Sequence, residues 1–191
     1  MEALVHKIKT AGTYVGGGIV KVDSFLNHQI DSALMGGIGD SFAEYFAHTK
    51  PTMILTAESS GIPPALMTGV KMNLPVVYAR KKEPLTMSKK VYYAEAPSRT
   101  KGGMTPLIVS PDYLPADARV LLIDDFLATG LTAVAMIDIV RQSGAKLVGV
   151  GCVVEKTFED GREQIQNVFD GPVHSLAKIS LHPDDSIEVT S

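Results

Sequence analysis

The sequence predicts a three-layer α/β fold with a mainly parallel central sheet. Two stretches carry this prediction, because each reads as a buried strand followed by a polar turn and a helix. In the first, the uninterrupted aliphatic run Val120–Ile123 leads into two aspartates and a small-residue loop, and a helix begins near Leu131. In the second, the apolar run Thr52–Ala57 leads into a loop of serine, glycine and proline and another helix. Leu147–Val154 is a third such run, and strand–helix units repeated along a chain build parallel sheets.

Length and charge narrow the class of protein. The 191 residues fit one domain with a substantial core. With 18 Lys and Arg against 21 Asp and Glu, the net charge of −3 argues against a broad basic surface, so no nucleic-acid partner is expected. No segment has the apolar length of a signal peptide or a membrane span, which predicts a cytoplasmic protein with no membrane partner. The single cysteine, Cys152, is expected to be a buried thiol, and the five histidines lack the spacing of a zinc site.

The first fifty residues are expected to form two helices separated by a loop. Glu2–Ala11 places apolar side chains on one face, and the glycines of Gly16–Gly18 end this element. Ile19–Ile30 mixes polar and aromatic residues without a clear period, so it is either a loop with a functional role or a connector to the next helix. Asp31 is a suitable N-cap for a helix that runs to about Ala47. The apolar stripe of that helix comprises Leu34, Ile38, Phe42 and Phe46.

The middle of the chain is expected to hold a strand and a hairpin. Pro75–Ala79 reads as a strand that delivers three consecutive cations, Arg80–Lys82, at its carboxyl end. Such a run is either a solvated face or, at the ligand-binding edge of a sheet, a means of neutralising an anion. Val91–Glu95 and Leu107–Val109 are then expected to pair as a hairpin around a polar tip.

The last third of the chain is expected to supply two more helices and an edge strand. The helix after the two aspartates should stop at Gly144, a residue suited to a left-handed C-cap. Asp160 and Glu163 form a capping-box pattern, which predicts a helix that continues to Gly171. Ile187–Thr190 has the pattern of an edge strand.

Two strand-to-helix loops have the chemistry of an anion site. A helix N-terminus offers unpaired backbone N–H groups, and the small residues of Ala128–Thr132 let an anion approach them. Ser59–Gly61 repeats the arrangement, although simple N-capping by Ser60 is an alternative there. Asp124 and Asp125 would repel a phosphate unless they accept hydrogen bonds from sugar hydroxyls or face a divalent cation. The combination indicates a phosphorylated, metal-bound sugar.

The stretch Val120–Ala133 resembles the phosphoribosyl pyrophosphate signature of the type I phosphoribosyltransferases, an apolar strand followed by two acids, two variable residues and Ala-Thr-Gly. The resemblance implies the fold of that family, a homodimer, and Mg²⁺ that is bound with the substrate rather than by the protein alone. It implies that Asp124 and Asp125 are the catalytic pair, holding the ribose hydroxyls with the metal near them. The residues that it assigns to phosphoribosyl pyrophosphate are Ala128, Thr129, Gly130, Leu131 and Thr132 in the signature, Ser59, Ser60 and Gly61 in the second loop, and Arg80 and Lys81.

The resemblance also implies how the single domain is organised. A small hood is expected from about residues 1–35 and 172–191, above a core of about residues 36–171. In this family a mobile hairpin closes over the active site, in the position of the predicted hairpin tip. Arg99 and Lys101 at that tip either bring charge to the leaving group or belong to an ordinary basic loop.

Further segments resemble the bacterial xanthine-using branch of the family, namely residues 21–31, 58–62, 79–81 and 154–156. By this likeness the reaction is transfer of the phosphoribosyl group from phosphoribosyl pyrophosphate to xanthine, giving xanthosine 5′-monophosphate and pyrophosphate in purine salvage. The base contacts would be Val20, Asn27 and Lys156, with Val20 standing where a larger leucine is expected. Two alternatives stay open: a transferase that prefers guanine or hypoxanthine, and a regulatory protein that senses phosphoribosyl pyrophosphate on the same fold.

Overall fold

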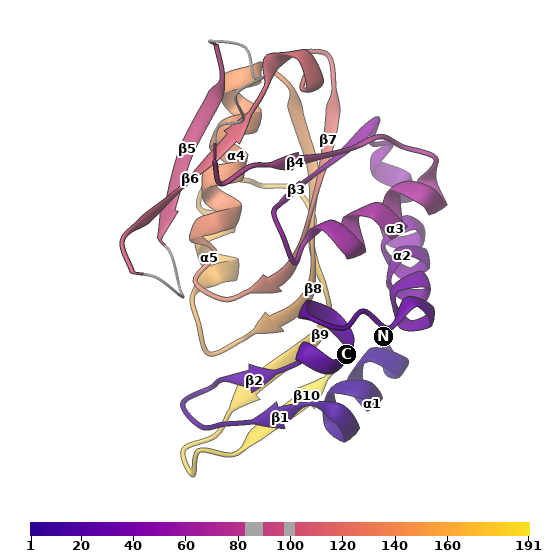
Figure 1. The fold of residues 1–191 in the computed structure, drawn as a ribbon, viewed down its shortest axis with the longest axis vertical. Helices are drawn as coiled ribbons and strands as arrows, with labels where there is room; N and C mark the ends of the chain where they lie inside the picture. The colour runs from indigo at the N-terminus through magenta and orange to yellow at the C-terminus, as the bar shows by residue number, and fades with distance from the viewer. Residues whose placement is uncertain (83–89, 98–101) are drawn as a thin grey trace.

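The computed structural model describes residues 1–82, 90–97 and 102–191. A six-stranded sheet runs through its centre in the order β10-β9-β8-β7-β3-β4 (Figure 1). The strands are β3 (Met53–Ala57), β4 (Val76–Ala79), β7 (Arg119–Leu127), β8 (Lys146–Lys156), β9 (Val173–Leu181) and β10 (Ile187–Thr190). All neighbouring pairs are parallel except β9 and β10.

Helices cover both faces of this sheet and make the outer two layers (Figure 1). They are α1 (Glu2–Ala11), α2 (Ser32–Phe46), α3 (Ile62–Met72), α4 (Leu131–Ser143) and α5 (Gly161–Gln166). The apolar stripe of α2 is buried with Ile54 and Leu121 on one face, while α4 is buried with Leu55 and Leu122 on the other. Successive residues of a strand point to opposite faces, so these short aliphatic runs fill two cores at once. The predicted three-layer fold with a mainly parallel sheet is confirmed.

The two ends of the chain meet at the lower end of the molecule in Figure 1, where α1, a small hairpin and β10 lie together. The hairpin consists of β1 (Thr13–Tyr14) and β2 (Val20–Lys21). The Tyr14 hydroxyl donates to the Asp185 carboxylate at 2.5 Å, and the N-terminal ammonium donates to the Leu176 carbonyl at 2.6 Å. The sheet is continuous into this region through β9 and β10. The division into hood and core remains a prediction.

Two predicted helix ends are confirmed. The Asp31 carboxylate accepts a hydrogen bond from the Leu34 backbone N–H at 3.1 Å, so Asp31 caps α2. Gly144 ends α4 with φ at +79°, a left-handed conformation that glycine adopts without a steric penalty. The predicted hairpin is also present, formed by β5 (Tyr92–Pro97) and β6 (Met104–Val109), which pair antiparallel.

The capping box was the wrong interpretation for α5. Asp160 is the N-cap residue, but its backbone lies at φ −78°, ψ 15° rather than in the extended region, and its side chain makes no capping hydrogen bond. The helix also ends at Gln166 instead of reaching Gly171. Beyond it, Val168 and Phe169 turn inward and pack against the core on the α4 side of the sheet.

Two other segments contain more regular secondary structure than the sequence predicted. Strand β7 continues four residues past Ile123, because Phe126 and Leu127 still pair with β8. The stretch that showed no clear period forms β2 and a π-helical turn, Asp23–Asn27, in which Phe25 and Leu26 are fully buried. Two 3₁₀ turns, Ala47–Thr49 and Pro111–Tyr113, complete the structure. Among the described residues, no helix has the length and apolar character to cross a membrane.

Candidate active site

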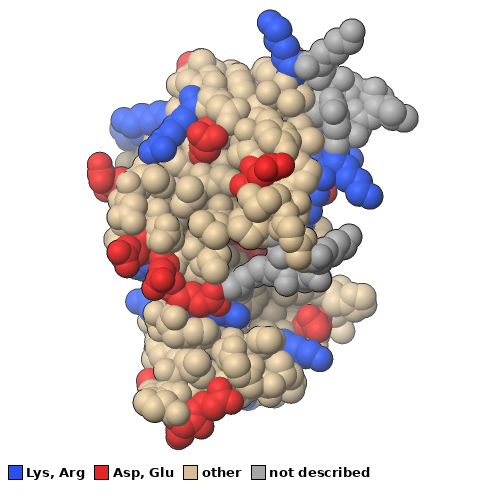
Figure 2. All heavy atoms as spheres, turned by 90° about the vertical axis from the view of Figure 1, so that its left-hand side faces the viewer, with Lys and Arg blue, Asp and Glu red and all other residues tan. Residues whose placement is uncertain are grey.

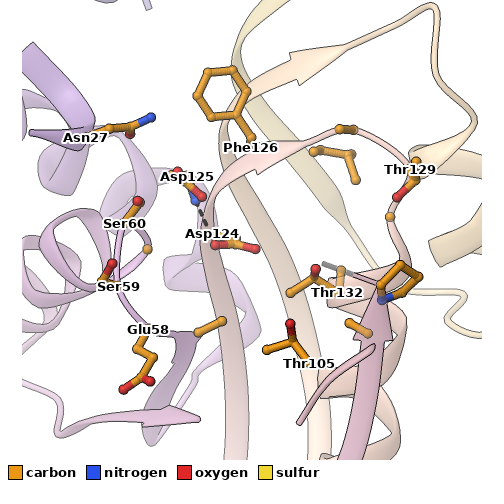
Figure 3. A pocket seen from close by; sticks show the side chains of 18 of the residues that line it. Asn27, Glu58, Ser59, Ser60, Thr105, Asp124, Asp125, Phe126, Thr129 and Thr132 are labelled. Carbon is orange, nitrogen blue, oxygen red and sulfur yellow. Dashed lines mark hydrogen bonds between the residues drawn. The ribbon is translucent and has the colours of Figure 1, made fainter. Parts of the chain in front are cut away.

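A cavity of about 480 Å³ opens at the carboxyl ends of the parallel strands. Six parts of the chain line it: the end of β7 with its loop into α4, the loop from β3 to α3, the segment after β4, the β5–β6 hairpin, the segment around β2 and the π-helical turn, and the end of β8. Open α/β sheets bind ligands at this edge. Figure 3 looks into the cavity and shows polar side chains from several of these parts facing it.

The acidic pair lies near the end of β7, at the centre of this cavity (Figure 3). Asp124 is only 7% exposed, and one of its carboxylate oxygens accepts a hydrogen bond from the Asp125 backbone N–H at 3.0 Å. Burial, together with the charge of Asp125, raises the pKa of Asp124 well above its ordinary value. Burial also raises the pKa of Asp125, while the ammonium of Lys81 acts in the opposite direction on both. Two carboxylates in this setting are stabilised as anions only when donors or a cation join them.

The loop from β7 to α4 places small residues at a helix N-terminus. Ala128, Thr129, Gly130 and Thr132 line the cavity, whereas Leu131 is 38% exposed and is not among the lining residues. Gly130 has φ at +75°, and a Cβ there would lie 2.5 Å from the backbone oxygen of Gly161. Only glycine fits this position.

Gly161, the first residue of α5, supports this loop from behind. A Cβ on Gly161 would overlap the carbonyl oxygen of Ala128 and would lie 2.9 Å from the Gly130 nitrogen. The two glycines therefore bring two backbones into direct contact. Gly161 was not among the predicted site residues, and its only local signal is a glycine directly after an aspartate at a helix start.

The loop from β3 to α3 faces the acidic pair across the cavity (Figure 3). Ser59, Ser60 and Gly61 all line the cavity, and Gly61 rather than Ser60 is the N-cap residue of α3. Glycine has no side chain that could cap the helix, so the predicted alternative of simple N-capping by Ser60 is not what the loop provides. Glu58, which we did not single out, also lines the cavity, and its carboxylate accepts a hydrogen bond from the Lys81 backbone N–H at 2.7 Å.

The basic residues after β4 divide between two positions. Lys81 lines the cavity. Arg80 does not: its backbone N–H and C=O bond to Ile108 of β6, both at 2.9 Å, and its Nε is buried without a hydrogen-bond partner in the described part of the chain. The strand-like pairing of Arg80 therefore fixes the direction in which Lys81 leaves the sheet.

Val20, Asn27 and Lys156, the three residues assigned to the base, also line the cavity. The Lys156 ammonium lies 3.7 Å from the Glu159 carboxylate and 5.9 Å from the centre of the Phe158 ring. Ile19 and Phe126 are two further lining residues, and both were missed. Phe126 follows the acidic pair directly and Ile19 precedes Val20, so each was adjacent to a residue already selected.

The β5–β6 hairpin forms one wall of the cavity through Ala96, Pro97 and Thr105. Its base is attached to α4, because the Gln142 side chain accepts from the Tyr93 backbone N–H at 3.0 Å and donates to the Tyr93 carbonyl at 2.7 Å. Arg99 and Lys101 lie outside the described residues.

The charges and donor groups define what this site can hold. On the face shown in Figure 2, lysine and arginine are interspersed with aspartate and glutamate rather than gathered into one basic area. Within residues 1–82, 90–97 and 102–191, no three His, Cys, Asp or Glu side chains form a cluster suited to a metal ion. Asp124 and Asp125 nevertheless offer the oxygen donors that Mg²⁺ prefers, and they fit a metal whose remaining ligands come from a substrate.

Comparison with known proteins agrees with this geometry. Residues 24–176 match the family model described as the phosphoribosyl transferase domain. A xanthine phosphoribosyltransferase of Deinococcus deserti is 51% identical over 179 residues, which cover 94% of this chain and 92% of that protein. A xanthine phosphoribosyltransferase of Geobacillus thermodenitrificans is 48% identical over 187 residues, covering 98% of this chain and 96% of that protein.

Solved structures show the same fold at lower identity. The adenine phosphoribosyltransferase of Rhodothermus marinus superposes with a TM-score of 0.75 at 24% identity, covering 95% of this chain and 100% of that chain. The Trypanosoma brucei adenine phosphoribosyl transferase gives a TM-score of 0.75 at 22% identity, covering 95% and 82% respectively. With the family model spanning most of the sequence and relatives of about half identity over nearly its whole length, the chain belongs to the phosphoribosyl transferase domain family.

Proposed function

We propose that this protein transfers the 5-phosphoribosyl group of phosphoribosyl pyrophosphate to xanthine, giving xanthosine 5′-monophosphate and pyrophosphate in purine salvage. The observation that carries the proposal is that one cavity gathers the acidic pair, two small-residue loops at helix N-termini, and the residues Asn27 and Lys156. The relatives of 44–51% identity that bear the name xanthine phosphoribosyltransferase support this choice of base.

The two loops suit the two charged ends of the donor substrate. Ala128–Thr132 opens helix α4, whose first N–H groups are free to bind the 5′-phosphate. Ser59–Gly61 opens α3 in the same way and lies with Lys81 on the side suited to pyrophosphate. Between the loops, Asp124 and Asp125 would accept hydrogen bonds from the two ribose hydroxyls.

The transfer breaks the bond between ribose C1′ and the pyrophosphate oxygen, and both electrons leave with pyrophosphate. A purine ring nitrogen supplies the pair that forms the new C1′–N bond. Because xanthine is a weak acid, its proton passes to solvent and little general-base work falls to the protein. Asp124 and Asp125 favour the positive charge that develops at C1′. Mg²⁺, carried with pyrophosphate and held near these two carboxylates, would neutralise part of the pyrophosphate charge.

The base end of the cavity suits a purine with two carbonyl groups. The Asn27 amide can donate to the 2-oxo group, where guanine carries an amino group that needs an acceptor. The Lys156 ammonium can donate to the second carbonyl. The Phe126 ring, which lines the cavity beside them, offers an apolar face to the purine. Val20 leaves this end roomier than leucine would.

Two further features belong to the proposal. We infer a homodimer from membership of the family, and a cytoplasmic location from a salvage reaction whose substrates are cytoplasmic.

The test is nucleotide formation with Mg²⁺, phosphoribosyl pyrophosphate and, separately, xanthine, guanine, hypoxanthine, adenine, uracil and orotate. The expected result is the highest kcat/KM with xanthine. A higher value with guanine or hypoxanthine would overturn the assignment of Asn27 as the reader of the 2-oxo group. Binding of phosphoribosyl pyrophosphate without turnover of any base would favour a sensing protein over an enzyme.

A further inference from the structure

Thr56 has a buried hydroxyl group that nothing in the described part of the chain explains. The residue lies in β3, one position before the strand ends, and is 0% exposed. Its Oγ1 has no hydrogen-bond partner among the described residues. Buried polar groups are nearly always hydrogen-bonded, because an unpaired one has lost its contact with water without replacement. An orphan hydroxyl next to a ligand cavity therefore indicates a partner in another state of the protein.

The surroundings of Gly61 show where that partner lies. A Cβ on Gly61 would overlap the Thr56 hydroxyl oxygen and would lie 2.7 Å from Oδ1 of Asp124. The hydroxyl and the carboxylate thus border the same narrow gap, which the absent side chain of Gly61 leaves open. The carbonyl oxygen of Ala57 borders it as well, 3.2 Å from the same point, and is the competing acceptor.

Asp124 needs a donor more than the Ala57 carbonyl does. Asp124 is 7% exposed, and its carboxylate accepts a hydrogen bond from the Asp125 backbone N–H and interacts with the Asp125 carboxyl group. The charged or titratable groups that face it are Asp125 on the same strand, Cys152 on β8 and Lys81 after β4, with Glu58 lining the cavity nearby. Of these, only Lys81 carries a positive charge. A further donor would therefore satisfy a carboxylate oxygen that water scarcely reaches.

We propose that Thr56 is a positioning residue for Asp124: when substrate occupies the cavity, the Thr56 hydroxyl donates a hydrogen bond to the Asp124 carboxylate and orients it toward the ribose. The proposal rests on the proposed function in one respect, since that function places Asp124 against the ribose hydroxyls. Thr56 itself does not reach the cavity, because Gly61 lies between them. Its effect passes entirely through the carboxylate.

Replacement by valine tests this, because Thr56→Val removes the hydroxyl and keeps the branched shape. At a fixed pH, kcat/KM for phosphoribosyl pyrophosphate should fall about tenfold, the effect of one lost hydrogen bond to a charged group, while the KM for xanthine changes much less. Thr56→Ser, which retains the hydroxyl, should restore the wild-type kcat/KM. A Thr56 that merely donates to the Ala57 carbonyl would change thermal stability and leave both constants in place.

Thr68→Val is the matched control. Thr68 is also 0% exposed, but its hydroxyl donates to the Pro64 carbonyl at 2.8 Å, within α3. This variant should lower the melting temperature without changing kcat/KM for phosphoribosyl pyrophosphate. An unchanged kcat/KM in Thr56→Val, or a fall in Thr56→Ser as large as that in Thr56→Val, would overturn the proposal. If Thr56→Val does not fold, Thr56→Ala is compared with Thr56→Ser by the same criteria.

Calorimetric binding of phosphoribosyl pyrophosphate with Mg²⁺ separates this inference from the proposed function. At one fixed pH the affinity should be lower in Thr56→Val than in the wild type and restored in Thr56→Ser, whether or not xanthine is turned over. Equal affinities in Thr56→Val and the wild type would refute the role of Thr56 even if the enzyme uses xanthine. Failure of the wild type to use xanthine, with the difference in affinity intact, would refute the proposed function alone.

Discussion

The contact between Gly130 and Gly161 makes the phosphate loop, Ala128–Thr132, which we propose binds the 5′-phosphate, sensitive to a single methyl group on Gly161. In Gly161→Ala the new Cβ would overlap the Ala128 carbonyl oxygen and lie 2.9 Å from the Gly130 nitrogen. Both are backbone atoms, so no side chain can rotate to make room. The loop has to move by roughly 1 Å, and a displacement of that size in a substrate-positioning group costs about 10²-fold in rate.

The expected result is a fall of about 10²-fold in kcat/KM for phosphoribosyl pyrophosphate, equivalent to about 2.7 kcal/mol of lost transition-state stabilisation. The KM for xanthine should change much less, because the residues assigned to the base lie on β2, the π-helical turn and β8. Steady-state kinetics with each substrate varied in turn measure both constants.

Gly36→Ala is the control for this variant. Gly36 lies inside α2, and a Cβ there would meet no atom within 4 Å. Alanine should therefore stabilise the protein by about 0.5–1 kcal/mol, since it lowers the entropy lost on forming the helix, and it should leave both KM values unchanged. Wild-type kinetics in Gly161→Ala, or an equal rise of both KM values, would refute the reasoning that this glycine holds the phosphate loop.

Three other predictions follow from the site and its supports. Asn27→Ala should raise the KM for xanthine by about tenfold, because one hydrogen bond of about 1.5 kcal/mol is lost. The KM for phosphoribosyl pyrophosphate should change less. Equal changes in the two KM values would exclude Asn27 as a residue that recognises the base. Gly18→Ala should raise the KM for xanthine more than that for phosphoribosyl pyrophosphate, because Gly18 has φ at +73° and a Cβ would lie 2.5 Å from the Phe158 ring. A rise confined to the KM for phosphoribosyl pyrophosphate would contradict this. Glu155→Gln should cost about 1–3 kcal/mol in denaturant unfolding at neutral pH, because it removes the charge from the hydrogen bonds that Arg162 makes to Glu155, one of them from Nε at 2.7 Å, while the Arg162 side chain remains 33% exposed. Burial opposes ionisation of Glu155, but the hydrogen bonds from Arg162 and Ser175 outweigh it and lower the pKa of Glu155. The ionised Glu155 therefore stabilises the folded protein above the ordinary carboxylate pKa, and this stabilisation is lost as pH falls through the lowered pKa of Glu155. The melting temperature of the variant should accordingly depend less on acid pH than that of the wild type.

The parts of the site that could be predicted are those encoded in adjacent residues. An aliphatic run, two acids and a small-residue loop specify a strand and a helix start without reference to the rest of the chain, although the strand itself continues to Leu127. The α2 cap at Asp31 and the α4 end at Gly144 are equally local. Each depends on the chemistry of one residue and the backbone beside it.

The parts that could not be predicted depend on contacts between distant segments. Gly161 matters because it touches a loop thirty residues earlier, and Thr56 matters because Gly61 and Asp124 lie beside it in space. Nothing in the local pattern of either residue records that neighbour. The end of α5 was also missed: Val168 and Phe169 lie beyond its last residue, Gln166, and pack against the core, which a local pattern does not record.

The extension of β7 past Ile123 has a consequence for the dynamics of the site. Asp124 and Phe126 face Cys152 and Val154 in the ladder with β8, so the segment bearing the acids belongs to the central sheet, whereas the loops Ser59–Gly61 and Ala128–Thr132 do not. Local opening of the loops would leave this ladder intact. In hydrogen exchange, the β7–β8 ladder amides should therefore exchange only with global unfolding, and phosphoribosyl pyrophosphate should add protection at Ser59–Gly61 and Ala128–Thr132 alone. Substrate would then order the loops around a pair of carboxylates whose backbone is already held in place.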